Sequence, residues 1–177
     1  CLMSLPGGPT KDEIMAVSLA KLSLRSGDIM ADIGCGTGTV AVEAARRVRK
    51  VFAVDLRPEA VAETRDLARS CGITNIEVRP GHGADLVKSL PHIDAAFIGG
   101  SRDLSAVLSG LSEKNVRSVV VNAVLLSTLH EAVTTMQELS MFREVVHVAV
   151  SRTVPLAGGL MFRPIDPVYI IVGGCPC

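Results

Sequence analysis

The sequence is poor in the features that mark several large classes of protein. Trp is absent, and four Phe with one Tyr bring the aromatic residues to only 3% of the 177 residues. Platforms that stack single-stranded nucleic acid need more aromatic side chains than this. Because 18 basic residues balance 18 acidic ones, no net charge draws the chain to nucleic acid or to a membrane. We therefore expect neither as a partner.

The cysteines do not form the framework of a small secreted domain. There are five, an odd number with irregular spacing, whereas disulfide frameworks consist of paired cysteines. The terminal Cys175-Pro176-Cys177 segment offers only two thiols, and a structural metal site needs about four ligands. The sequence therefore predicts no metal site.

Long apolar segments are also missing. A membrane span needs about 20 apolar residues, but the apolar run 116–129 is interrupted by polar side chains. No signal peptide is visible, because residues 6–10 break the start of the chain and charged residues follow. We expect a cytoplasmic protein. Since the first residue is Cys1 rather than Met, we also expect a processed or excised piece of a longer chain.

Short apolar runs alternate with helical patterns, which is typical of βαβ units and a mostly parallel sheet. We expect strands at 28–33, 51–54, 76–79, 95–98 and 118–122, and helices at 11–24, 39–48, from 58, 84–89, 104–112 and 126–139. Thr10 and Glu13 form a predicted capping box for the first helix. We find no linker or repeat, so residues 1–177 are predicted to be one domain that opens with a helical segment, 1–24.

The end of the chain has a different pattern. Strand-like runs at 144–151 and 168–172 have no helical pattern between them, and strands joined without a crossover helix should pair antiparallel. The connection 152–167 is rich in Gly and Pro, and we expect it to be a mobile segment on the substrate side. A parallel sheet closed by an antiparallel pair resembles the seven-stranded α/β (Rossmann-like) sheet of class I methyltransferases that use S-adenosylmethionine.

The strongest local signal is the segment 32–38, Asp-Ile-Gly-Cys-Gly-Thr-Gly, which follows a strand and opens a helix. Its glycines let the backbone turn sharply and approach a ligand closely, at the edge of the sheet where ligands of such folds bind. Asp32 is positioned to hold an ammonium group or to orient the loop. Asp55, at the end of the second strand, is positioned to accept both hydroxyls of a ribose.

Two other interpretations of this loop stay open. A dinucleotide site has the pattern G-x-G-x-x-G, but here Thr39 stands in the third position and Gly38 comes one residue early. The loop is also compatible with a tight turn that binds nothing. Asp32 and Asp55 together favour S-adenosylmethionine.

The loop after the third strand, 79–85, is expected to pass the adenine of the cofactor. Asp85 alternatively caps or leads the next helix. His82 is a candidate for contact with cofactor or substrate, although an isolated loop histidine is more often solvated.

Four segments resemble the cobalt-precorrin-6B C15-methyltransferase (decarboxylating) family of cobalamin biosynthesis, whose fold also forms the C-terminal half of precorrin-6Y C5,15-methyltransferases. They are Gly-Pro-Thr-Lys at 8–11, the glycine segment 32–38, Phe-Ile-Gly-Gly-Ser at 97–101 and the last strand, 167–173. The first and third are far more specific than the glycine segment. One departure is Gly-His-Gly at 81–83, where the family often has Gly-Asp-Ala.

The resemblance implies methyl transfer from S-adenosyl-L-methionine to C15 of a corrinoid tetrapyrrole precursor, with loss of carbon dioxide from the ring C acetate. It also implies a homotetramer, and a partner or fused domain that methylates C5. The implied cofactor contacts are Thr10, the loop residues Gly34, Cys35, Gly36, Thr37 and Gly38, and Asp55 and Gly83.

The predicted chemistry asks little of protein nucleophiles, because the acceptor is an electron-rich carbon and catalysis comes mainly from alignment. A substrate with many carboxylates needs cationic side chains. Arg102, Arg152 and Arg163 are the candidates, although each is individually more typical of a solvated surface. In the 152–167 connection, Gly158, Gly159 and Met161 are expected to supply mobility and an apolar surface.

Three alternatives stay open. A tRNA or protein methyltransferase can have the same sheet, but the Gly-Gly-Ser loop differs from the Asp/Asn-Pro-Pro-aromatic pattern of amino-group enzymes. A binding subunit could retain S-adenosylmethionine without catalysis. An NAD-dependent oxidoreductase would bind a nicotinamide cofactor instead.

Overall fold

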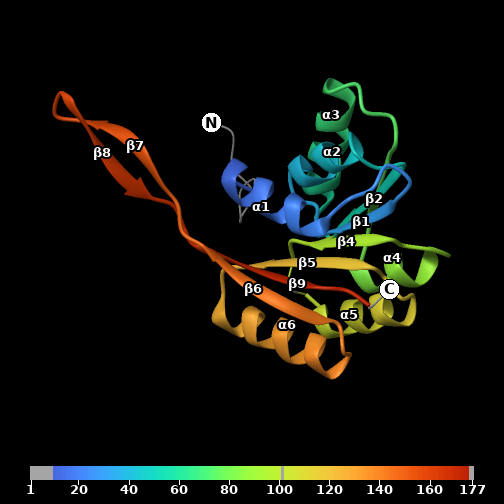
Figure 1. Ribbon diagram of the computed structural model, residues 1–177. Coiled ribbons are helices and arrows are strands. Elements are labelled where there is room, and N and C mark those ends of the chain that lie inside the picture. Colours follow the sequence, from blue (N-terminus) through green and yellow to red (C-terminus); the bar gives the residue numbers. More distant parts are fainter. Residues whose placement is uncertain (1–9, 101, 176–177) are drawn as a thin grey trace.

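The computed structural model describes residues 10–100 and 102–175, and within them the centre of the molecule is a seven-stranded sheet (Figure 1). Its strands are β1 Ile29–Ile33, β2 Lys50–Asp55, β3 Ile76–Pro80, β4 Ala95–Ile98, β5 Ser118–Ala123, β6 Phe142–Val148 and β9 Val168–Gly173. Their order is β3-β2-β1-β4-β5-β9-β6. Neighbours from β3 to β5 run parallel, whereas β9 is antiparallel to both β5 and β6. The predicted mostly parallel sheet with an antiparallel C-terminal pair is confirmed.

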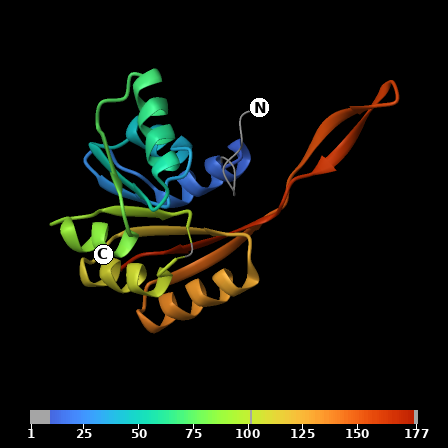
Figure 2. The ribbon, with the colours of Figure 1, turned by 180° about the vertical axis from the view of Figure 1, so that it is seen from behind.

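Helices cover both faces of this sheet (Figures 1 and 2). One face carries α1 Asp12–Leu22, α2 Thr39–Ala45 and α3 Pro58–Ser70, and the other carries α4 Gly83–Ser89, α5 Leu104–Glu113 and α6 Leu126–Glu138. Alternate strand residues enter two separate cores: Ala96 and Ile98 pack towards α4–α6, while Ala95 and Phe97 pack on the opposite side. Burial on both faces explains why central strands such as β4 and β5 are nearly continuous apolar runs rather than alternating ones.

The first helix differs from its prediction. It begins after Lys11, whose side chain makes no capping hydrogen bond, and it ends at Leu22 because Ser23 adopts a left-handed conformation with φ 48°. The predicted capping box of Thr10 and Glu13 is wrong, since the Glu13 carboxylate accepts two hydrogen bonds from the Arg152 guanidinium instead.

The connection 152–167, predicted to be a mobile segment rich in Gly and Pro, contains strands that the sequence did not predict. It forms a two-stranded antiparallel ribbon of β7 Ser151–Leu156 and β8 Gly159–Pro164, which projects away from the body in both views (Figures 1 and 2). The two residues between the strands, Ala157 and Gly158, have φ values of 47° and 80°, as a tight hairpin turn requires. The prolines in this segment made strands difficult to predict, because proline is found mainly in edge strands. Both strands of this ribbon are edge strands.

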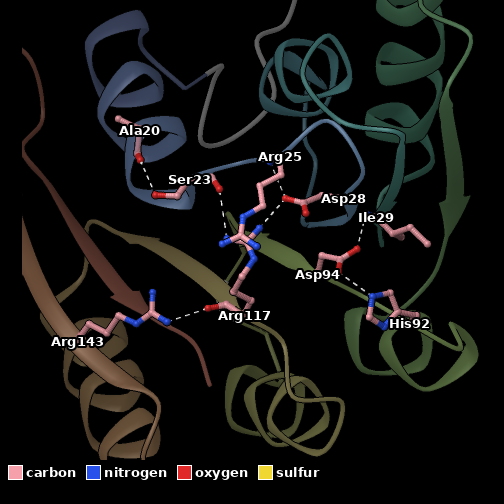
Figure 3. Close-up of polar contacts among 9 residues, drawn as sticks. All are labelled: Ala20, Ser23, Arg25, Asp28, Ile29, His92, Asp94, Arg117 and Arg143. Carbon is pink, nitrogen blue, oxygen red and sulfur yellow. Dashed lines mark hydrogen bonds and ion pairs between the residues drawn. The ribbon is translucent and has the colours of Figure 1, made fainter. Parts of the chain in front are cut away.

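A polar network joins the strands at the amino end of the sheet (Figure 3). Arg117, just before β5, donates to Asp28 Oδ2 at 2.7 Å, and the backbone N–H of Arg25 donates to the same oxygen at 2.8 Å. Asp94, just before β4, accepts from the backbone N–H of Ile29 at 2.8 Å. The amino ends of β1, β4 and β5 are therefore tied together by side chains.

Candidate functional site

The glycine loop at the end of β1 is held in place by neighbouring backbone. The N–H groups of Gly34 and Cys35 both donate to the carbonyl of Val54, at 2.9 and 3.1 Å. Gly34 has φ +75°, and a Cβ built on it would lie 2.7 Å from the backbone nitrogen of Gly100. A Cβ on Gly38, with φ +81°, would lie 2.7 Å from the Thr64 side chain. Both positions therefore require glycine.

Two adjoining cavities open at the carboxyl edge of the sheet. The first, about 480 Å³, includes Asp55, Leu56, Arg57, Gly81, Gly83 and Arg102 in its lining. The second, about 300 Å³, includes Thr10, Lys11, Thr37, Phe97, Asn122 and Asp166. Gly34, Arg57 and Gly99 line both. The glycine loop thus stands at the junction of the two cavities, at the sheet edge where ligands of such folds bind.

Asp55 is a buried carboxylate with several hydrogen bonds. Its Oδ2 accepts from the backbone N–H of Gly36 at 3.0 Å, and its Oδ1 accepts from the backbone N–H of Arg57 at 3.0 Å. The Arg57 guanidinium adds a bidentate contact, Nε to Oδ1 at 3.0 Å and Nη2 to Oδ2 at 3.1 Å. Burial alone would raise the pKa of Asp55, but these donors hold the pKa below its ordinary value. Asp55 is therefore an anion that ties the glycine loop to β2.

Asp32 lies in β1 and is completely buried; neither carboxylate oxygen has a donor in good hydrogen-bond geometry, and the backbone N–H of Ala41 only partly offsets the burial. Burial, reinforced by the nearby charge of Asp55, raises the pKa of Asp32 to about 7. Asp32 does not appear in the lining of either cavity. This position fits the predicted role of orienting the loop from behind better than a direct contact with an ammonium group.

Most of the other predicted loop residues line the second cavity. They are Cys35, Gly36 and Thr37, which line it together with Thr10, whereas Gly38 lines neither cavity. Burial raises the pKa of Cys35 to about 12, and its Sγ lies 3.4 Å from Thr64 Oγ1. Cys35 is therefore a neutral thiol and not a nucleophile at physiological pH.

The loop after β3 is divided between the site and the surface. Gly83 lines the first cavity, and a Cβ built on it would overlap the Ile33 side chain. His82 does not line either cavity; its Nδ1 lies 3.2 Å from Asp103 Oδ2, and about half of each side chain is exposed. The structure thus places Gly83, and not His82, in the cavity wall.

The three arginines predicted to bind substrate carboxylates do not come together. Arg102 lines the first cavity. Arg152 and Arg163 lie opposite each other in the ribbon. The Arg152 guanidinium donates to the Glu13 carboxylate of α1. Neither of these two arginines lines either cavity. Gly8, Pro9 and Ser101, which belong to the segments used for the family resemblance, lie outside the described residues.

Four polar residues of the cavity walls were not predicted from the sequence. Lys11, Asn122 and Asp166 line the second cavity, and Arg57 lines both. Asn122 is the penultimate residue of the apolar strand β5, and its Oδ1 accepts from the buried Ser18 hydroxyl at 3.0 Å. The missed signal was a polar side chain at or just after the carboxyl end of a buried strand, which is the position of Asn122 and Arg57.

In the described part of the chain, no helix is long and apolar enough to cross a membrane.

Known proteins resemble the chain over nearly its whole length. A family model described as a precorrin methyltransferase domain matches residues 5–173. A Methanosarcina mazei protein named "Probable cobalt-precorrin-6B C(15)-methyltransferase (decarboxylating)" is 47% identical over 177 residues, which covers 97% of this chain and 96% of that protein.

Solved structures give the same result. A Methanobacterium thermoautotrophicum protein described as precorrin 8W decarboxylase is 30% identical, with a TM-score of 0.91 and coverage of 97% of this chain and 96% of that chain. A Geobacter metallireducens protein described as precorrin-6y C5,15-methyltransferase is 32% identical, with a TM-score of 0.88 and coverage of 94% and 90%.

Proposed function

This chain belongs to the precorrin methyltransferase domain family, and from that premise we propose that it methylates C15 of cobalt-precorrin-6B and removes carbon dioxide from the ring C acetate. S-adenosylmethionine is the proposed co-substrate. The observation that carries the proposal is the glycine loop at the junction of two cavities, with one cavity on the Asp55 side and the other towards β5. Such an arrangement lets a cofactor span both and present a group to a second ligand.

The residues present fit S-adenosylmethionine. Gly34 lines both cavities, and its close packing against Gly100 fixes the loop backbone beside them. Asp55 would hold the ribose hydroxyls in the first cavity, with Gly83 on the adenine side, whereas Thr10 and Thr37 would hold the amino-acid end in the second. When bound, the cofactor supplies an electrophilic methyl group.

The chain's own residues would act mainly by alignment. An electron-rich ring carbon can attack a methyl group without a protein nucleophile, and orientation alone accounts for a large rate gain. The only described cysteine in the cavity walls, Cys35, is a neutral thiol. The second cavity offers Phe97 and Val168 as apolar wall and Lys11 and Asn122 as donors. At about 300 Å³ it would take one edge of a macrocycle rather than enclose it.

We also propose that the ribbon of β7 and β8 mediates a homotetramer. Leu160 and Phe162 near its tip are 74% and 70% exposed, and Leu156 is 58% exposed. A projecting segment with such apolar exposure is typical of an interface. Light scattering on the wild type and on Leu160→Ser/Phe162→Ser tests this, since the proposal requires the double variant to dissociate.

A cytoplasmic location, a partner that methylates C5, and a single domain over 1–177 stay predictions.

Calorimetric titration with S-adenosylhomocysteine, with NADH as the control ligand, tests the cofactor. We expect binding of the first and not of NADH, and loss of binding in Asp55→Ala. Turnover of cobalt-precorrin-6B is then followed by mass spectrometry, where the product gains CH₂ and loses CO₂. Methyl transfer to tRNA or protein instead of the corrinoid would contradict the proposal.

A further inference from the structure

Arg57 lies in the walls of both cavities and is paired with Asp55 in the first. Its guanidinium makes a bidentate ion pair with the Asp55 carboxylate, and its side chain is still 38% exposed. A Cβ built on Gly36 would lie 3.8 Å from Arg57 Nη2, so the guanidinium packs beside the glycine loop. Among the described residues, only Arg57, Gly34 and Gly99 line both cavities.

The hydrogen-bonding capacity of Asp55 is filled in this arrangement. A carboxylate has about four acceptor positions. Asp55 Oδ1 accepts from the backbone N–H and the Nε of Arg57, and Asp55 Oδ2 accepts from the backbone N–H of Gly36 and the Nη2 of Arg57. Two of these four donors belong to the guanidinium. A ribose that donates two hydroxyls to Asp55 therefore competes with Arg57 for the same oxygens.

We propose that cofactor binding transfers the Arg57 guanidinium from Asp55 to a carboxylate of the substrate. Arg57 is then a substrate-binding residue that couples the two sites, and the cofactor favours binding of the acidic substrate. This inference rests on the proposed function, because it needs a ribose-bearing cofactor and a polycarboxylate acceptor.

A substrate carboxylate can compensate for this exchange. A neutral ribose that displaces the guanidinium ends its ion pair with Asp55, and an ion pair with a substrate carboxylate would replace it. Arginine binds carboxylates through two parallel hydrogen bonds, and a tetrapyrrole with acidic side chains offers such groups beside the second cavity. Arg102 lies only in the wall of the first cavity, and Arg152 is held by Glu13. Arg57 is therefore better placed than the arginines predicted from the sequence.

The test is a binding cycle with S-adenosylhomocysteine and a stable porphyrin octacarboxylate as substrate probe, measured by calorimetry. In the wild type we expect S-adenosylhomocysteine to tighten probe binding by at least about 5-fold, the lower range of typical coupling between sites. In Arg57→Ala we expect this enhancement to disappear, while S-adenosylhomocysteine binds at least as tightly as to wild type. Arg57→Lys, which keeps the charge but loses the bidentate geometry, should restore part of the enhancement.

Arg69→Ala is the matched control, because Arg69 lies at the other end of α3 from Arg57, is 78% exposed and pairs with Asp66. It should keep the full enhancement. Failure of the wild type to bind S-adenosylhomocysteine would overturn the proposed function itself. If the wild type binds both ligands independently, or if Arg57→Ala weakens S-adenosylhomocysteine binding and keeps the enhancement, Arg57 merely supports Asp55 and this inference is overturned. Thermal unfolding of each variant shows that it is folded.

Discussion

Two buried aspartates at opposite ends of β1, Asp28 and Asp32, have opposite surroundings. At the amino end, Asp28 accepts from Arg117 and from the backbone of Arg25, and Asp94 accepts from the backbone of Ile29 (Figure 3). At the carboxyl end, Asp32 is fully buried, and neither of its oxygens has a donor in good hydrogen-bond geometry, although the backbone N–H of Ala41 lowers its pKa slightly. Burying a carboxylate with so little hydrogen bonding costs stability, so Asp28 helps to hold the strands together, whereas Asp32 is an unfavourable arrangement behind the glycine loop.

The difference extends to the backbone. At the carboxyl end, Gly34 and Gly38 have positive φ and no room for a Cβ, so the loop is packed into one shape. This comparison predicts that changes at the carboxyl end remove ligand binding and that changes at the amino end remove stability.

The largest expected effect is that of Gly34→Ala. The new Cβ would lie 2.7 Å from the Gly100 backbone, which cannot yield without moving the loop. Because a misplacement of about 1 Å in a site costs about 100-fold or more, we expect S-adenosylhomocysteine binding to be lost in calorimetry. Gly72→Ala is the control, since Gly72 has φ +66° but no atom near a new Cβ. It should cost only about 1 kcal/mol of stability. Unchanged binding in Gly34→Ala would contradict the packed-loop interpretation.

At the amino end, Arg117→Ala should lower the free energy of unfolding by about 3 kcal/mol, because it leaves a buried Asp28 without its cation. The side chains of Arg117 and Asp28 are only 16% and 6% exposed. Urea unfolding measures the loss, and Arg69→Ala, which removes an exposed pair, should change stability by less than about 1 kcal/mol. The binding constant for S-adenosylhomocysteine should stay within about twofold of wild type; a larger fall would mean that the two ends are energetically coupled.

Most of the sheet could be predicted from the sequence because its central strands, such as β4 and β5, are buried on both faces. Runs such as 95–98 are apolar throughout and bounded by turns, so β4 was placed correctly. The loop 32–38 was also recognisable, since glycine spacing after a strand reflects local backbone geometry. The ribbon of β7 and β8 was missed because its residues are exposed and carry no burial pattern.

Contacts between distant residues explain what the sequence could not show at the site. Arg152, a predicted substrate-binding residue, pairs with Glu13, 139 positions earlier in the chain. Asn122 was missed although it lies near the end of a strand, because only the folded sheet brings it to the wall of the second cavity. Local motifs therefore predicted the glycine loop, whereas the partners of exposed charges depend on tertiary contacts that no short pattern contains.

The comparison can be sharpened by titrating Asp32. Its pKa in the folded state is about 7, raised from 3.8 chiefly by burial, so between these values the folded state binds more protons than the unfolded state. Stability then falls as pH rises, and we expect Asp32 to lower the free energy of unfolding by about 2 kcal/mol from pH 5 to pH 7. Urea unfolding across this range should show that slope in the wild type but not in Asp32→Asn. Asp66→Asn, an exposed control on α3, should keep it. A slope retained in Asp32→Asn would assign the effect to another group.

The smallest expected effect tests whether burial, rather than hydrogen bonding as such, makes the amino end stabilising. His92 lies 2.7 Å from Asp94 Oδ1, but its side chain is 59% exposed. We expect His92→Ala to change the free energy of unfolding by at most about 0.5 kcal/mol, as for other exposed pairs.

Asp94→Ala removes the acceptor of the Ile29 N–H at the start of β1 as well, and it should cost about 1.5 kcal/mol, the value of a hydrogen bond to a charged group. Urea unfolding of both variants at pH 6, side by side, separates the two contacts. Equal losses would show that the exposed histidine contributes as much as the backbone contact, and burial would then not explain why the amino end stabilises the sheet.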